Sequence, residues 1–153
     1  MLLWDKIKTL KRNEKILRQI SKEATWEEVE KINLINRLRT MNDKAWTEGC
    51  GLSAIQIGIP LRVAWFVLDG KEEILFNPKI TSGIGSVDSK EGCLSIPNRY
   101  TTVKRNYTIE YISDGKKKKA KGFRAKVIQH EIDHMDGILN IDKEILWVYE
   151  PQR

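Results

Sequence analysis

The sequence predicts a single α+β domain spanning residues 1–153. Helical periodicity of apolar residues occurs early in the chain and again near its end. The stretch between them holds short runs of β-branched and aromatic residues bounded by turn residues. The length suits one hydrophobic core, and 41% hydrophobic with 31% charged residues is typical of a globular protein.

The first helix is expected over residues 26–46. Its apolar residues recur three positions apart, at Val29, Ile32, Ile35, Leu38 and Met41. Thr25 and Glu28 precede this run with the spacing of a capping box, which satisfies free N–H groups at a helix start. Glycines at 49, 51 and 58 and a proline at 60 end the helical pattern.

Strands are expected in the middle of the chain, at residues 61–68, 73–76, 101–104 and 107–113. The Asp114-Gly115 pair predicts a turn from the last of these into a lysine-rich segment, residues 116–121. We interpret that segment as an exposed edge strand, because lysines at a sheet edge prevent pairing with other chains.

The second helix is expected over residues 122–137, with Gly137 placed where a helix C-terminal cap would lie. This helix contains His130-Glu131-Ile132-Asp133-His134, the H-E-x-x-H pattern. One helical turn separates the two histidines, so both imidazoles face the same side with a carboxylate beside them. That arrangement favours a metal site, although so short a pattern also arises on packed helices without a metal.

A third protein ligand is needed for a catalytic site that keeps a position open for water. The chain has only two histidines, and Asn140 stands where one metalloprotease class has its third. A thermolysin-like glutamate is also disfavoured, because only Glu144 and Glu150 occur among the 19 residues after His134. Cys93, between a glycine and a strand-like segment, is the expected third ligand.

The sequence strongly resembles the peptide deformylase family in three ordered motifs. They are Gly49-Cys50-Gly51-Leu52-Ser53-Ala54-Ile55-Gln56, Glu91-Gly92-Cys93-Leu94-Ser95 and the segment from Gln129 to Gly137, which contains the H-E-x-x-H pattern. The likeness extends over about residues 16–145 by motif placement. It implies a deformylase-like α+β fold, with antiparallel strands around a central H-E-x-x-H helix.

The resemblance also implies hydrolysis of the formyl group from formylmethionyl peptides and nascent proteins, with release of formate. Cys93, His130 and His134 would hold one divalent metal, iron(II) in the native enzyme and replaceable by zinc, nickel or cobalt. Glu131 would move the protons of the attacking water. The Gln56 side-chain amide and the Leu94 backbone N–H would stabilise the oxyanion.

The expected substrate contacts lie near the metal. Gly51 and Cys50 belong to the glycine loop, where Cys50 is expected as a small apolar contact rather than a second ligand. Phe123 and Val127 fall on the histidine face of the helix and are predicted to line a pocket for the methionine side chain.

Two departures from the family pattern stand out. Ser53 occupies a position where alanine is usual, and its hydroxyl needs a partner if it is buried. The chain ends at Arg153 without the long C-terminal helix that many bacterial members have, as expected of a phage-encoded or trimmed enzyme.

The formal charge of +6 and pI near 9.3 leave an alternative open, a basic RNA- or ribosome-binding module with a structural metal. Structural zinc sites favour four ligands and paired cysteines, whereas this chain has no C-x-x-C.

The first twelve residues have no apolar run typical of a signal peptide or membrane span. A cytoplasmic monomer that associates transiently with ribosomes is therefore expected.

Overall fold

The computed structural model describes residues 6–44 and 51–145. Its helices are α1 (Leu10–Leu17), α2 (Trp26–Lys31), α3 (Leu34–Lys44) and α4 (Gly122–Met135), with short 3-10 helices η1 (Ala54–Ile57) and η2 (Asn140–Lys143). The strands are β1 (Gly51–Ser53), β2 (Val63–Leu68), β3 (Lys71–Phe76), β4 (Lys79–Ile84), β5 (Val87–Cys93), β6 (Ile96–Arg105), β7 (Thr108–Ser113) and β8 (Lys116–Lys121). Among these residues, no helix is both long and apolar enough to traverse a lipid bilayer.

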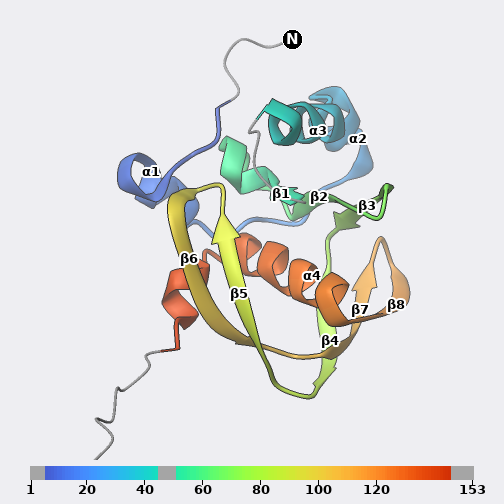
Figure 1. Ribbon diagram of the computed structural model, residues 1–153. Helices are drawn as coiled ribbons and strands as arrows, with labels where there is room; N and C mark the ends of the chain where they lie inside the picture. The colour runs from blue at the N-terminus through green and yellow to red at the C-terminus, as the bar shows by residue number, and fades with distance from the viewer. Residues whose placement is uncertain (1–5, 45–50, 146–153) are drawn as a thin grey trace, which may run out of the picture.

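The strands form two three-stranded sheets, ordered β1-β2-β3 and β4-β7-β8, and a separate β5-β6 hairpin. Every strand pair is antiparallel. Figure 1 shows α4 in the middle of the molecule, with strands around it and with α2 and α3 on the far side of the first sheet. The predicted α+β class, with antiparallel strands, is confirmed.

Strand β2 is buried on both faces, which explains why its sequence is a continuous apolar run. Val63 and Trp65 belong to the core cluster that also contains residues of α2 and α3. Ala64 and Phe66 belong to a second cluster, formed mainly with α4 and β7. The first sheet therefore separates two apolar layers, and α4 is held from one side by β1 and β2.

The helix predicted over residues 26–46 is divided in the structure into α2 and α3. Its predicted start is confirmed, because Thr25 and Glu28 form a capping box. Asn33 has φ 53°, a left-handed conformation that interrupts the helical hydrogen bonds and that asparagine tolerates better than most residues. The apolar periodicity continues across this break, so it did not reveal the division. Residues 45 and 46 lie outside the described residues.

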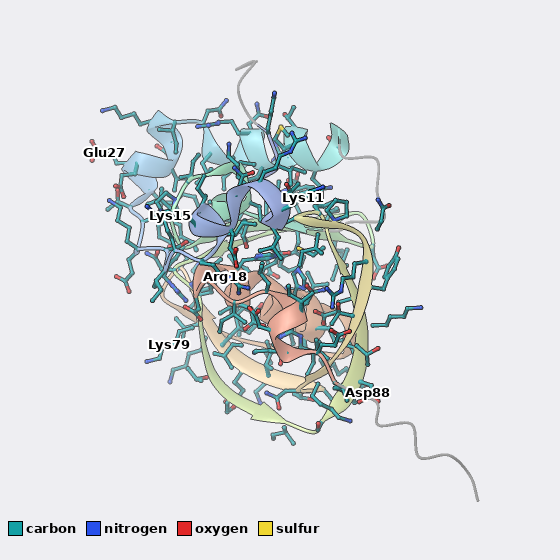
Figure 2. The ribbon with its side chains drawn as sticks, turned by 90° about the vertical axis from the view of Figure 1, so that its left-hand side faces the viewer. Lys11, Lys15, Arg18, Glu27, Lys79 and Asp88 are labelled. Carbon is teal, nitrogen blue, oxygen red and sulfur yellow. The ribbon has the colours of Figure 1, made fainter. Side chains whose placement is uncertain are left out.

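Helix α4 agrees with the predicted second helix and is fixed at its C-terminal end. Gly137 has φ 73°, and a Cβ atom at this position would lie 2.4 Å from the carbonyl oxygen of Arg18. The Arg18 guanidinium, seen below α1 in Figure 2, also pairs with Asp142 of η2. The N-terminal segment and the C-terminal end of α4 are thus packed so closely that only glycine fits at this position.

The lysine-rich segment is β8, and it lies at the edge of its sheet as predicted. The strands predicted at 61–68, 73–76, 101–104 and 107–113 correspond to β2, β3, β6 and β7, although β6 begins earlier, at Ile96. Helix α1 and strands β1, β4 and β5 were not predicted. Strand β5 matters most for function, because Cys93 is its last residue.

Candidate active site

Helix α4 presents the two histidines to the same side, one turn apart. Their ring centroids are 4.9 Å apart, and their Nε2 atoms are separated by 3.2 Å. His134 is almost fully buried, while His130 is partly exposed to a cleft. The helical spacing read from the sequence therefore brings two ring nitrogens to one point.

Cys93 reaches the same point from the β5-β6 hairpin. The pairing of the two strands shifts between Gly92 and Cys93, and Leu94 and Ser95 form the turn that follows. The Cys93 Sγ atom lies 3.4 Å from His134 Nε2. All three potential ligand atoms lie within 4.8 Å of one another.

These separations fit a shared metal ion. With metal–nitrogen bonds of about 2.05 Å and a metal–sulfur bond of about 2.3 Å, tetrahedral ligands are separated by about 3.3 Å (N···N) and 3.6 Å (N···S). The structure has 3.2 Å between the imidazole nitrogens and 3.4 Å between sulfur and nitrogen. One thiolate with two imidazoles suits zinc, iron, nickel or cobalt rather than magnesium or calcium.

The electrostatics of the three residues favour the thiolate form. Burial alone would raise the pKa of Cys93, but His134 and His130 beside it lower that pKa well below its usual value. Burial would likewise lower the pKa of His130, whereas Cys93 and Glu91 raise it well above its usual value. The thiolate is the form of cysteine that binds metals, and a divalent cation would replace the proton shared within this group.

Glu91 orients His130 by contacting the ring nitrogen that does not face the cluster. Its Oε1 atom lies 2.9 Å from His130 Nδ1, which leaves Nε2 directed toward Cys93. Arg105 donates two hydrogen bonds to Glu91, at 2.8 and 2.9 Å, and a third to Asp133 at 2.5 Å. Against the effect of burial, Arg105 and His130 lower the pKa of Glu91 to about 2. The buried carboxylate therefore remains ionised.

Asn140 has a supporting position beneath the site. This residue stands where one metalloprotease class has its third histidine, but it is not part of the clustered group of Cys93, His130 and His134. Its Nδ2 donates to the main-chain carbonyl of Glu91 at 3.2 Å. Asn140 thus stabilises the strand that carries Cys93.

Glu131 is buried next to the two histidines, with only 4% of its surface exposed. The Ser53 hydroxyl lies 2.7 Å from Glu131 Oε2, so the hydroxyl that sequence analysis expected to need a partner has one. Gly51 lies against the other carboxylate oxygen, since a Cβ atom there would be 3.2 Å from Oε1. The carboxylate is held at the floor of the cleft.

Gln56 approaches Cys93 from η1 and is 2% exposed. Its Oε1 accepts a hydrogen bond from the Ser53 N–H at 2.9 Å, which directs its Nε2 toward the site. Nε2 donates to Ser95 Oγ at 3.1 Å and lies 3.7 Å from Cys93 Sγ. A polar donor therefore lies directly beside the Cys93 thiol.

A cleft of about 630 Å³ opens onto this group. Its lining contains nearly all of the predicted site residues: Gly51, Gln56, Cys93, Leu94, Phe123, Val127, His130 and Glu131. Val127 is 7% exposed, whereas Phe123, predicted to line the same pocket, is 64% exposed. The predicted contact at Cys50 lies outside the described residues.

Comparison with known proteins decides the family. The family model for polypeptide deformylase matches residues 6–146. The chain belongs to this family. It is 42% identical over 143 residues to a peptide deformylase of Helicobacter acinonychis, with 84% of this chain and 80% of the relative covered. It is also 42% identical over 147 residues to that of Pelotomaculum thermopropionicum, covering 89% and 90%.

Solved structures of deformylases share the fold. A deformylase from Synechococcus elongatus, in complex with actinonin, has a TM-score of 0.82 at 30% identity, covering 93% of this chain and 79% of the other. A probable deformylase from Synechococcus phage S-SSM7 has a TM-score of 0.77 at 36% identity, covering 91% and 99%. The chain is therefore a hydrolase that removes the N-terminal formyl group from nascent peptides.

Sequence reasoning assigned no role to several residues of this deformylase site. Glu91 and Ser95 belong to the family motif that contains Cys93. Their position close to Cys93 in the sequence was the signal that could have indicated a role in the site. Arg105 had no local signal, because the β5-β6 hairpin brings it to Glu91 across 14 positions of the chain. Asn140 was noted only as a missing histidine.

Proposed function

We propose that Cys93, His130 and His134 bind one divalent metal ion, which is iron(II) in the native enzyme and which zinc, nickel or cobalt can replace. The proposal rests on the convergence of one thiol and two imidazoles at the floor of a cleft. When bound, the metal would lower the pKa of a water molecule and polarise the formyl oxygen.

In this proposal Glu131 accepts a proton from the attacking water and later donates it to the leaving amine. Glu131 is buried at the cleft floor beside the proposed metal ligands, where its carboxylate can reach a water molecule in the cleft. Negative charge then develops on the former carbonyl oxygen. Gln56 Nε2 and the Leu94 backbone N–H would donate hydrogen bonds to it, since both residues line the cleft beside Cys93.

The methionine side chain of the substrate would lie against Val127 and Phe123. Both residues line the cleft one and two turns before His130 on α4. Gly51 lies on the cleft floor next to Glu131, where the absence of a side chain lets substrate backbone approach closely. Cys50 would add a small apolar contact.

The alternative of a basic RNA-binding module with a structural metal has no support from the comparisons. Structural zinc sites are usually closed by four protein ligands. Within the described part of the chain the cluster has three, and it opens onto a cleft with a carboxylate beside it. That arrangement suits hydrolysis.

The cellular location of the enzyme is inferred from its substrate. Nascent chains are made in the cytoplasm, so we place the enzyme there, acting as a monomer. Transient ribosome association is proposed on the net charge of +6, which would attract the protein to an RNA surface.

The deciding experiment is formate release from formyl-Met-Ala-Ser by anaerobically purified protein, with metal analysis of the same sample. We expect about one metal ion per chain, because residues 6–44 and 51–145 contain one such three-residue cluster, and we expect turnover that a chelator abolishes. Metal-loaded protein that releases no formate would refute the proposed function.

A further inference from the structure

The hydroxyl of Ser53 is buried with the carboxylate of Glu131. Ser53 is the last residue of β1 and is fully buried, as its relative exposure is 0%. Its Oγ atom lies 2.7 Å from Glu131 Oε2 and 3.0 Å from the main-chain carbonyl of the same residue. The carboxylate is the closer acceptor, and ionised acceptors form the stronger hydrogen bonds.

The two carboxylate oxygens of Glu131 consequently have different surroundings. Oε2 faces the Ser53 hydroxyl in the protein interior. Oε1 lies near Gly51, which lines the cleft and has no side chain to cover it. A hydrogen bond on Oε2 therefore fixes the carboxylate torsion so that Oε1 is the oxygen presented to the cleft. The terminal torsion of glutamate is otherwise only weakly constrained.

Ser53 also orients the second polar group of the site. Its backbone N–H donates to Gln56 Oε1 at 2.9 Å, so the amide nitrogen of Gln56 points toward Ser95 and Cys93. One residue thus holds a carboxylate through its side chain and an amide through its main chain. The backbone contact does not depend on which side chain is present, whereas the contact to Glu131 does.

We propose that Ser53 is a positioning residue that holds the Glu131 carboxylate in the orientation needed to accept the proton of the attacking water. The inference rests on the proposed function, because it assigns Ser53 a role only through Glu131. Ser53 contacts neither the proposed metal ligands nor the cleft surface. Its contribution is therefore to turnover rather than to metal binding or substrate affinity.

Ser53→Ala removes this hydroxyl and leaves the backbone contact to Gln56 intact. Loss of a hydrogen bond to a buried charged group should lower kcat by about fivefold to tenfold, with KM for formyl-Met-Ala-Ser and metal content unchanged. Ser113→Ala is the matched control. Ser113 is also fully buried on a strand, but its Oγ contacts the Phe76 N–H outside the cleft. That variant should lose thermal stability and keep its kcat.

The same substitution in a Glu131→Gln background tests whether Ser53 acts through the carboxylate. Without a carboxylate to position, Ser53→Ala should change the residual kcat by less than about twofold, because substitutions at contacting residues are not additive. A kcat for Ser53→Ala within twofold of wild type, or an equal loss in both backgrounds, would overturn the inference. Wild-type protein that releases no formate would overturn the proposed function itself, and the role of Ser53 with it.

Discussion

Substitution of Glu131 by glutamine separates metal binding from proton transfer. Glutamine keeps the length of the side chain, and its carbonyl oxygen can still accept from the Ser53 hydroxyl, which lies 2.7 Å from Oε2 in the structure. Glu131 is not among the clustered ligand atoms of Cys93, His130 and His134. We therefore expect Glu131→Gln to bind metal at the wild-type level.

The expected loss of turnover is large, because the amide cannot accept the proton. General base catalysis contributes about a hundred- to ten-thousand-fold, or about 3 to 5.5 kcal/mol of barrier. Glu131 is only 4% exposed, and its neighbours Ser53 and Gly51 provide no second carboxylate at the same oxygen positions. The fall in kcat should be at least a hundredfold by the same reasoning.

The assay is steady-state formate release from formyl-Met-Ala-Ser, with metal content and thermal unfolding measured on the same preparations. Glu73→Gln is a matched control, because Glu73 is also a largely buried glutamate (side chain 10% exposed) but pairs with Arg124 and Lys118 outside the cleft. It should lose stability and keep kcat. A Glu131→Gln enzyme with unchanged metal and kcat within a few-fold of wild type would refute the proton-transfer role.

Four further substitutions test the site and its support. Cys93→Ala should lose metal and activity together, because only two protein ligands remain. Cys50→Ala should keep both. If metal analysis finds full metal occupancy in Cys93→Ala, another residue is the third ligand. Val127→Asp should raise KM for formyl-Met peptides by about tenfold or more, because a charge replaces a residue that is 7% exposed and lines the cleft. An unchanged KM would place the methionine pocket elsewhere. Arg105→Met should lower the free energy of unfolding by about 3 kcal/mol, because it removes the cation that bridges Glu91 and Asp133 and leaves these carboxylates only His130 and Lys143. Urea denaturation measures this loss, and a wild-type midpoint would contradict it.

Local patterns in the sequence predicted several elements. Helix α4 was recognisable from its helical period, and strands β2, β3 and β7 were recognisable from short runs of apolar, β-branched and aromatic residues bounded by turn residues. Strand β8 was recognisable from its lysines and the preceding Asp114-Gly115 turn. The sequence also placed His130 and His134 together, because residues four apart on a helix share a face whatever surrounds the helix.

Other elements had no such pattern. Strand β5 reads Val-Asp-Ser-Lys-Glu-Gly-Cys and is largely exposed or half-buried, so neither propensity nor alternation revealed it. The division between α2 and α3 depends on the left-handed conformation of Asn33, which apolar periodicity does not report. Helix α1 is short, and Leu17 is its buried residue.

The sequence by itself determined the family motifs, the face that holds both histidines and the candidate third ligand, Cys93. Tertiary structure alone decided that Cys93 Sγ lies 3.4 Å from His134 Nε2 and that Arg105 and Glu91 support His130. It also decided that the Ser53 hydroxyl faces Glu131 across 78 positions of the chain. The physical reason is that helical periodicity fixes neighbours three or four residues apart, whereas contacts between β1, β5, β6 and α4 depend on how the whole chain packs.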